Sequence, residues 1–184
     1  MALEQIIIDG KQVATLKELL KPSLRAVIVG VNPGLRSVSL GHYWQGQHGK
    51  LMWGLLCQHG ILSSLQQGQE DDDAFDQGIG FADLIRRPSL SADEFTDQDL
   101  QAAVPDLLSR LSGAGPVPII FRYKRPYETV GELIRRAGHE TFRIPSPPGR
   151  FSDPPEKATA LMTALRARLG TITLPAASPE PPGR

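Results

Sequence analysis

The chain of 184 residues lacks the features that mark disulfide-rich, metal-rich or membrane-spanning proteins. Its single cysteine, Cys57, excludes an intramolecular disulfide framework and a multi-cysteine zinc or iron–sulfur site. No uninterrupted apolar stretch approaches the roughly 18 residues of a transmembrane helix, and the N-terminus lacks the basic flank and apolar run of a secretory signal. We therefore expect a cytoplasmic protein with no membrane partner.

A net charge is also missing, because Lys plus Arg and Asp plus Glu each total 20. This balance argues against a protein that works through a global positive field on nucleic acid or membrane. The balance is a sum of unlike parts, since residues 70–99 carry a net charge of −8, residues 1–69 carry +3 and residues 100–184 carry +5. A neutral total can therefore hide a basic face.

Apolar runs and turn residues divide the chain into alternating strands and helices. The strongest strand candidate is the β-branched run of residues 25–31, which is typical of a strand buried on both faces of a parallel sheet. Further strands are predicted at residues 6–8, 79–85, 117–123 and 139–144, and helices at residues 51–59, 98–111, 126–137 and 155–169. Between them the pattern predicts a helical turn through Leu16, Leu19 and Leu20, a polar loop over 35–49, and a solvated loop or helix edge over 70–76.

This alternation predicts a layered α/β fold with a mainly parallel sheet. We expect one domain over residues 1–170, with residues 1–23 as an N-terminal extension packed on it, and a disordered tail over residues 171–184. Ligands of such folds bind outside the carboxyl ends of the strands. The loops after Val31, Tyr123 and Ile144 are therefore the places to look for chemistry.

Asn-Pro-Gly at residues 32–34 directly follows the strongest predicted strand. A tight turn explains these three residues alone, because Asn and Gly tolerate unusual backbone angles and Pro fixes one. The segment 41–50 that follows interleaves Tyr43 and Trp44 with Gly and polar residues. Exposed aromatic residues in such a loop suit stacking on a planar ligand better than burial in a core.

Two other segments combine turn residues with groups that bind ligands. Residues 144–150, Ile-Pro-Ser-Pro-Pro-Gly-Arg, read either as a structural linker or as a loop that meets phosphate, because they follow a predicted strand and precede a helix. Asp83 lies among apolar residues in the segment 80–88. It is either a cap of a helix or turn, or a carboxylate that faces a cleft.

In their order along the chain, these segments resemble the mismatch-specific uracil-DNA and thymine-DNA glycosylases. Residues 29–37, Val-Gly-Val-Asn-Pro-Gly-Leu-Arg-Ser, the loop 41–44 and the helix start 50–53 look like the first motif of that family. Residues 80–89 are similar to its middle segment, and residues 144–150 resemble the thymine-DNA glycosylase form of its second motif. The resemblance depends on the ordered combination of the motifs.

The resemblance implies a three-layer α/β/α sandwich with a short, mainly parallel central sheet. It implies hydrolysis of the N-glycosidic bond of uracil, or of a related damaged base, flipped out of double-stranded DNA, by a protein that we expect to be a monomer. Asn32 would hold the hydrolytic water, Trp44 would stack on the flipped base, and Arg150 would enter the vacated base stack. Asp83 stands where better-known members carry Lys or Asn, and we expect it to act as a second catalytic group, a base or an electrostatic stabiliser.

The remaining contacts are expected around these residues. The expected substrate-binding residues are Gly30, Val31, Pro33, Gly34, Tyr43, Trp44 and Ser146. The expected DNA-binding residues are Lys50, Arg122, Lys124, Pro147, Pro148, Gly149 and Arg150. The cations among them, together with Arg125, Arg143 and Lys157, would form a phosphate-facing rim around the strand ends, although ordinary solvated surface explains each of them as well.

This chemistry requires neither a metal nor a cofactor. An amide positions a water without titrating, because its carbonyl accepts a hydrogen bond while its NH₂ group donates elsewhere. The four histidines, at positions 42, 48, 59 and 139, show no metal-ligand spacing. The main alternative is a catalytically weakened DNA-binding relative of the same fold, while a nucleotide-binding α/β enzyme lacks support because the chain has neither Gly-x-Gly-x-x-Gly nor Gly-Lys-Ser/Thr.

Overall fold

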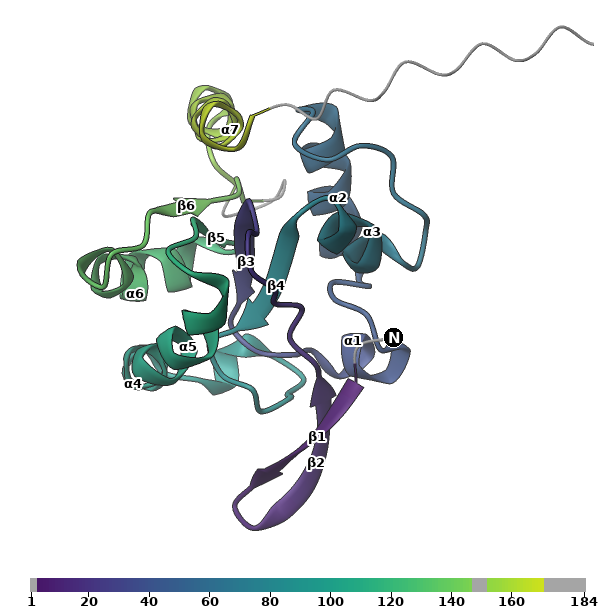
Figure 1. Cartoon of the computed structure of the whole chain (residues 1–184), viewed down its shortest axis with the longest axis vertical. Helices are drawn as coiled ribbons and strands as arrows, with labels where there is room; N and C mark the ends of the chain where they lie inside the picture. The colour runs from purple at the N-terminus through teal and green to yellow at the C-terminus, as the bar shows by residue number, and fades with distance from the viewer. Residues whose placement is uncertain (1–2, 147–151, 171–184) are drawn as a thin grey trace, which may run out of the picture.

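The computed structural model describes residues 3–146 and 152–170. At its centre lies a four-stranded parallel sheet with the strand order β4–β3–β5–β6 (Figure 1). The strands are β3 (Ala26–Gly30), β4 (Ile79–Asp83), β5 (Ile119–Phe121) and β6 (Thr141–Arg143). Helices join consecutive strands, as parallel neighbours require. The predicted α/β fold with a short parallel sheet is confirmed.

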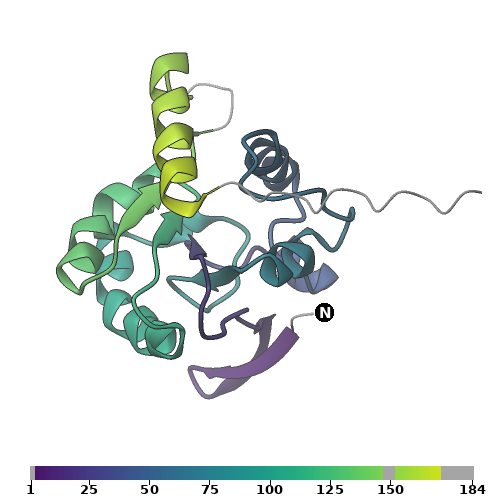
Figure 2. The ribbon, with the colours of Figure 1, turned by 45° about the horizontal axis from the view of Figure 1, so that its top comes forward.

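Helices cover both faces of this sheet (Figures 1 and 2). They are α1 (Leu35–Leu40), α2 (Gln47–Gln58), α3 (Glu70–Asp76), α4 (Asp97–Ala102), α5 (Val104–Leu111), α6 (Lys124–Arg136) and α7 (Pro155–Leu169), with short 3₁₀ turns at Ala92–Glu94 and Ser112–Ala114. On one face, α2, α3 and α7 pack against strand residues such as Ile28, Phe81 and Ile120. On the other face, α4, α5 and α6 cover Val29 and Phe121. The three layers α/β/α thus follow from strands whose alternate residues enter two separate cores.

The register of the sheet sets the position of the candidate site. β3 is buried along its whole length, which explains its run without polar residues. Gly30, the last residue of β3, pairs with Asp83, the last residue of β4. The carboxyl ends of these two strands therefore coincide at one edge of the sheet.

A hairpin separate from the sheet precedes it. β1 (Leu3–Ile8) and β2 (Lys11–Leu16) pair in antiparallel register around Asp9 and Gly10, whose φ angles are 50° and 72°. Such a pair of positive φ angles matches the twist of a two-residue hairpin turn. The predicted helical turn through Leu16, Leu19 and Leu20 is therefore wrong: Leu16 ends β2, and Leu19 forms an isolated bridge with Phe81.

Other elements differ from the sequence-based expectations in identifiable ways. The expected polar loop over 35–49 contains α1 and the first turn of α2. The single helix expected over 98–111 is two helices that meet at Ala103, because Pro105 has no N–H to donate to the carbonyl oxygen of Gln101 and instead lies in the first turn of α5. The expected helix over 155–169 is α7, with the same limits. None of the described helices has both the length and the apolar character that a bilayer crossing requires.

Candidate active site

The Asn-Pro-Gly loop lies against the segment that follows β4. Beyond the ends of β3 and β4, the backbone of residues 30–34 stays paired with residues 84–89 through hydrogen bonds from Ile85 N to Val31 O (2.9 Å) and from Ser89 N to Pro33 O (3.2 Å). Val31 and Pro33 are buried, while Gly34 is exposed and precedes α1. The first motif and the middle segment of the resemblance are therefore held side by side by backbone hydrogen bonds.

Asn32 is half-buried in this edge and has a fixed orientation. Its Nδ2 donates to the hydroxyl of Ser89 (2.8 Å) and to the carbonyl oxygens of Arg87 and Pro33 (both 3.2 Å). The hydroxyl of Ser89 in turn donates to the carbonyl of Ser91 (2.7 Å). Because these acceptors hold the NH₂ side of the amide, Oδ1 of Asn32 is left as an acceptor with no hydrogen bond from the described residues. The importance of Ser89 is not visible in the sequence.

Asp83 lies at the end of β4 with only 3% of its surface exposed. Its Oδ2 has no hydrogen-bond partner among the described residues. Burial raises the pKa of this carboxyl group to about 8, against a smaller lowering by the charge of Arg86. Asp83 is thus not the capping residue of a helix or turn, but a buried acid that titrates near neutral pH.

The loop between α1 and α2, residues 41–46, contains Tyr43 and Trp44 and is called the aromatic loop below. It packs over these strand ends. The ring of Trp44, which is half-buried, lies 5.6 Å from that of Phe81 and 6.1 Å from that of Trp53, centroid to centroid. Trp44 has a φ of 50°, and a Cβ atom on Gly49 would lie 1.7 Å from its carbonyl oxygen. Only a glycine at position 49 therefore allows α2 to begin directly against the Trp44 backbone.

Tyr43 does not occupy the exposed position expected from its loop. It is 2% exposed and belongs to the core on the α2 face, with its ring 5.5 Å from Phe81. The polar, Gly-rich sequence around it concealed this burial. Tyr43 therefore packs against Trp44 from the core side, with ring centroids 5.6 Å apart, and in this conformation it cannot stack on a base.

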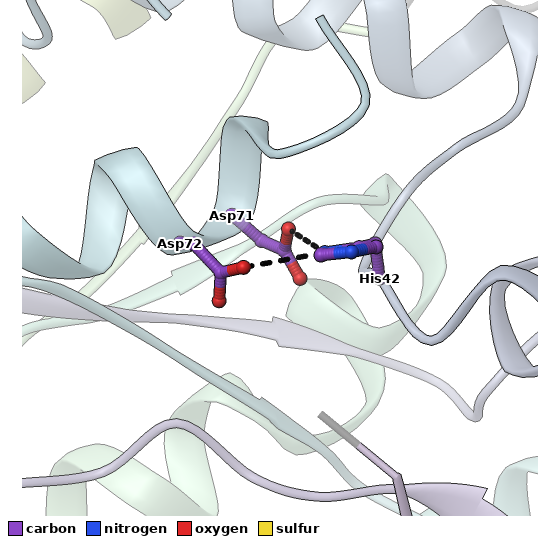
Figure 3. A group of neighbouring side chains, drawn as sticks. All are labelled: His42, Asp71 and Asp72. Atoms are coloured by element: carbon purple, nitrogen blue, oxygen red, sulfur yellow. Dashed lines mark hydrogen bonds and ion pairs between the residues drawn. The ribbon is translucent and has the colours of Figure 1, made fainter. Parts of the chain in front are cut away.

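Hydrogen bonds to the acidic helix α3 anchor the start of the aromatic loop (Figure 3). Nδ1 of His42 lies 2.9 Å from Oδ1 of Asp71, whose other oxygen accepts a hydrogen bond from the backbone N–H of Tyr43 (2.7 Å). Asp72 approaches the same nitrogen at 3.6 Å. The acidic segment is thus a helix with a fully buried aspartate rather than a solvated loop.

These three side chains bring ligand-type atoms within 4.8 Å of one another, although the histidines show no metal-ligand spacing in the sequence. Both oxygens of Asp71 already accept hydrogen bonds from the loop, from the His42 ring and from Tyr43 N–H. The group therefore has a structural explanation of its own, namely that it fixes the aromatic loop on α3.

The segment after β6 is held by a buried ion pair. Arg143 and Asp153, which are 3% and 5% exposed at their side chains, form a bidentate pair in which Nη1 lies 2.6 Å from Oδ2. The same Oδ2 accepts from the backbone N–H of Ser146 (2.8 Å). Arg143 therefore does not lie on a phosphate-facing rim, and Ser146 is fixed at the start of the second motif. Residues Pro147, Pro148, Gly149 and Arg150 lie outside the described residues.

The other expected DNA-binding cations do not form one rim. Arg122 follows β5 and is 1% exposed, so that it is a core residue rather than a rim residue. Lys50 is exposed on α2, and Lys124 begins α6, which covers the opposite face of the sheet. The hydrogen bond from Arg122 N to Val29 O (3.3 Å) places Arg122 beside the end of β3.

A cavity of about 780 Å³ opens between α2 and α7, next to this end of the sheet. Its lining is mainly apolar, with Met52, Ile144 and Met162, and includes Arg122 and Ser146. Such a size and composition are typical of small-molecule and base pockets. Gly30, Trp44 and Asp83 form one cluster at the strand ends, and Asn32 follows on the loop after β3. Of the expected site residues, Arg122 and Ser146 line the cavity, whereas Gly30, Asn32, Trp44 and Asp83 do not.

The fixed amide and the buried acid thus lie at the carboxyl ends of parallel strands, which is where α/β proteins of this class bind their ligands. The model of the uracil DNA glycosylase superfamily matches residues 18–170 of the chain. The chain therefore belongs to this superfamily, and the matched range contains every site residue described above. Membership implies an N-glycosylase that hydrolyses the bond between a base and deoxyribose, with DNA as its substrate.

Proposed function

We propose that the chain is a mismatch-specific uracil-DNA glycosylase. It removes uracil, or another deaminated or mismatched base, from double-stranded DNA after the base has been flipped out of the helix. The observation that carries the proposal is the orientation of Asn32, whose NH₂ group is held by three acceptors while its carbonyl oxygen is left for a water. An amide held in this way orients the water without competing for its proton.

The reaction places specific demands on the rest of the site. Breaking the glycosidic bond builds positive charge on the sugar and negative charge on the departing base. Trp44, on the loop beside Gly30, offers a face on which the flipped base stacks, and stacking returns about 1–3 kcal/mol of the free energy spent on flipping. Asp83 supplies a carboxyl group that, with a pKa of about 8, changes its charge in the range where enzymes use a general base.

DNA is held in this proposal by local rather than global charge. The acidic excess of the chain lies in residues 70–99, and α3 uses Asp71 to hold the aromatic loop. The exposed cations Lys50 and Lys124 lie outside this acidic segment. Modest binding is expected from a few phosphate contacts on a protein with no net charge, and each contact adds about −0.9 to the slope of log K against log salt concentration.

Excision assays with single-base substrates test the proposal. The wild type is expected to form abasic sites in an oligonucleotide duplex with one G·U pair, and Asn32→Ala is expected to lose at least about a hundredfold in single-turnover rate, as for loss of one positioned polar group. Gln12→Ala, which removes an exposed amide on the hairpin, is the matched control and should keep the wild-type rate. Parallel duplexes with thymine, hypoxanthine or xanthine define the preferred base.

The same assay separates the enzyme from a DNA-binding relative without turnover. If the wild type bound the G·U duplex but formed no abasic sites at any enzyme excess, the chain would be a DNA-binding relative without turnover, and the proposed glycosylase activity would be overturned. Equal excision rates for the wild type and Asn32→Ala would remove Asn32 from the mechanism.

A further inference from the structure

Arg122 is a buried cation that has no counter-charge among the residues that the structure describes. Its side chain is among the largest that are fully buried in the fold, and its guanidinium lies over the ring of Tyr123, 5.0 Å from the centroid. Among the described residues, only Nη2 has a hydrogen-bond partner, the carbonyl oxygen of His48 at 2.9 Å. Nε and Nη1 have no partner there. Burial lowers the pKa of this guanidinium, but an arginine in a protein stays protonated. A buried charge with two unused donors is costly unless a ligand pairs with it.

The neighbouring Arg143 shows how this fold treats a buried arginine that has only a structural role. Arg143 ends the adjacent strand β6, is 3% exposed at its side chain, and pairs with both oxygens of Asp153. Arg122 has no such carboxylate among the described residues, although it directly follows β5, the strand that pairs with β6. The missing partner is therefore a local property of Arg122.

Arg122 borders the candidate site on the side opposite to Asp83. Ile28, Phe81 and Ile120 point into the core on the α2 face, so the alternation of side chains directs Gly30, Asp83 and Arg122, two residues further along each strand, to that same face. Asp83 and Arg122 flank the central strand, whose last residue carries no side chain. Two strand spacings, about 9–10 Å, separate their backbones. The carboxyl group of Asp83 and the ring of Trp44 occupy the space above Gly30, so the open space beside Arg122 is the cavity between α2 and α7, which this arginine lines.

The head group of Arg122 also lies close to the aromatic loop. Its partner His48 precedes Gly49, whose Cα lies against the carbonyl oxygen of Trp44. The guanidinium is thus at the start of α2, beside the loop that presents the stacking residue. It also lines the cavity between α2 and α7 together with Ser146.

We propose that Arg122 is a further catalytic residue of the glycosylase, whose free N–H groups bind the anionic oxygen of the departing base. This role rests on the function proposed above. As the bond between C1′ and the base nitrogen breaks, its electron pair stays on the base and spreads to the exocyclic carbonyl oxygens, where Arg122 donates. The water held by Asn32 forms the new bond to C1′ and loses a proton, and the released base takes up a proton from solvent.

Burial favours the base over a backbone phosphate as the ligand. A phosphate in duplex DNA remains on the outside of the molecule, whereas the Arg122 head group is almost inaccessible to solvent. A flipped base is planar, uncharged before the reaction, and enters a closed pocket. In that dry setting, donors aimed at developing charge have their largest effect on the rate.

A comparison of two leaving groups tests the role. In single-turnover assays on duplexes with one uracil or one 5-fluorouracil, Arg122→Met should lose about 10²–10³-fold on uracil and clearly less on 5-fluorouracil, because the fluorine already stabilises the base anion. Arg122→Lys should recover part of the rate. Affinity for a duplex with an uncleavable 2′-fluoro-deoxyuridine should change little, since Arg122 acts mainly on charge that develops in the transition state.

Thermal unfolding of the same proteins separates catalysis from folding. Arg122→Met should keep or raise the melting temperature, because no carboxylate loses its partner, whereas the matched control Arg143→Met should lower it by leaving Asp153 unpaired. Equal losses on both bases, or a loss confined to DNA affinity, would overturn the proposal in favour of packing or a phosphate contact. If the wild type excised no base at all, the glycosylase function itself would fall, and the role of Arg122 with it.

Discussion

A Cβ atom on Gly30 would lie 2.2 Å from Oδ1 of Asp83, so the ends of β3 and β4 leave no space for a side chain between them. The same atom would lie 3.6 Å from the ring of Trp44. Asp83 Oδ1 is the tip of a short side chain enclosed by neighbours, so it cannot move away freely. Gly30 is thus required by the close approach of the acid and the aromatic residue, and not by its own backbone angles.

Gly30→Ala should therefore destabilise the fold and displace Asp83. Overpacking of a buried site costs about 1–3 kcal/mol, and we expect this loss in the free energy of unfolding measured in urea. Gly54→Ala in α2 is the control, because a Cβ atom there meets nothing within 4 Å and alanine favours the helix. Equal stability of the two variants would show that Asp83 relaxes without cost.

The raised pKa of Asp83 predicts how stability changes with pH. At a pH below the unfolded-state pKa of about 4, the carboxyl group is protonated in both states and contributes no difference. As the pH rises from there to the folded-state pKa of about 8, the unfolded chain releases the proton and the folded chain keeps it, so stability falls. Asp83→Asn removes this loss, and its advantage over the wild type should grow between about pH 5 and pH 8.

Urea unfolding across this pH range measures the effect, with an upper limit of about 1.4 kcal/mol for each pH unit. Gln12→Ala, which removes an exposed side chain without a titratable group, is the control and should show a constant difference from the wild type. A constant difference for Asp83→Asn as well would mean that Asp83 titrates like an exposed acid.

The same group should govern the pH dependence of excision if Asp83 acts as a base. The single-turnover rate of the wild type should then rise with pH and level off near the pKa of about 8, because only the carboxylate accepts a proton. Asp83→Asn should be slower and should lack this rise. Retention of the full rate by Asp83→Asn on every base would exclude a catalytic part for the carboxylate.

The sequence predicts the sheet well because each central strand is apolar on both faces. The run of residues 25–31 needs no information from distant residues to be read as a buried strand, and it contains β3. The start of α2 is different, since Gly46 and Gly49 disfavour a helix locally and the contact of Gly49 with Trp44 explains why a glycine is needed. In that segment, tertiary packing overrides the low helix propensity of the residues.

The site was only partly predictable for a related reason. Asn32 and Asp83 could be named because they follow or end recognisable strands. The burial of Asp71 within an acidic run depends on His42 and Tyr43, which lie 29 and 28 residues away in the sequence. Likewise, nothing in the sequence around Arg122 distinguishes a buried arginine from a surface one. Arg122 directly follows the short strand β5, and its burial depends on α2, which lies more than 60 residues earlier in the sequence.

Asp71 should be more important for the aromatic loop than its acidic neighbours. Asp71→Asn keeps the size of the side chain but replaces one acceptor oxygen with a donor, so that either His42 or the N–H of Tyr43 loses its partner. An unsatisfied buried group costs about 1–3 kcal/mol, and urea unfolding should show a loss in this range. Excision should weaken as well, because the loop that holds Trp44 loses its anchor.

Asp72→Asn is the matched control for Asp71→Asn. Asp72 stands next to Asp71 on α3 but is 40% exposed at its side chain and approaches His42 at 3.6 Å. Its replacement should cost less than half as much free energy of unfolding, since solvent screens the interaction. Similar losses for the two variants would show that total charge near His42, and not the buried hydrogen bonds, holds the loop.

Asp153 should act as the anchor of the second motif, since it joins Arg143 to the backbone of Ser146. The pairing with Arg143 holds the pKa of Asp153 well below its usual range. Its contribution to stability is therefore present above the unfolded-state pKa of about 4 and is lost as the pH falls below it. Asp153→Asn at neutral pH should lower the free energy of unfolding by about 3–5 kcal/mol, because Arg143 is then left buried without a counter-charge.

Glu140→Gln provides the comparison, because Glu140 forms an exposed ion pair with Arg168 and should cost less than about 1 kcal/mol. Adding Arg143→Met to Asp153→Leu should restore much of the stability, since an apolar pair can replace a buried ion pair. Excision should not recover in this double variant, because Ser146 has still lost the acceptor for its N–H. Recovery of both stability and rate would show that the ion pair serves only the fold and that Ser146 needs no anchor.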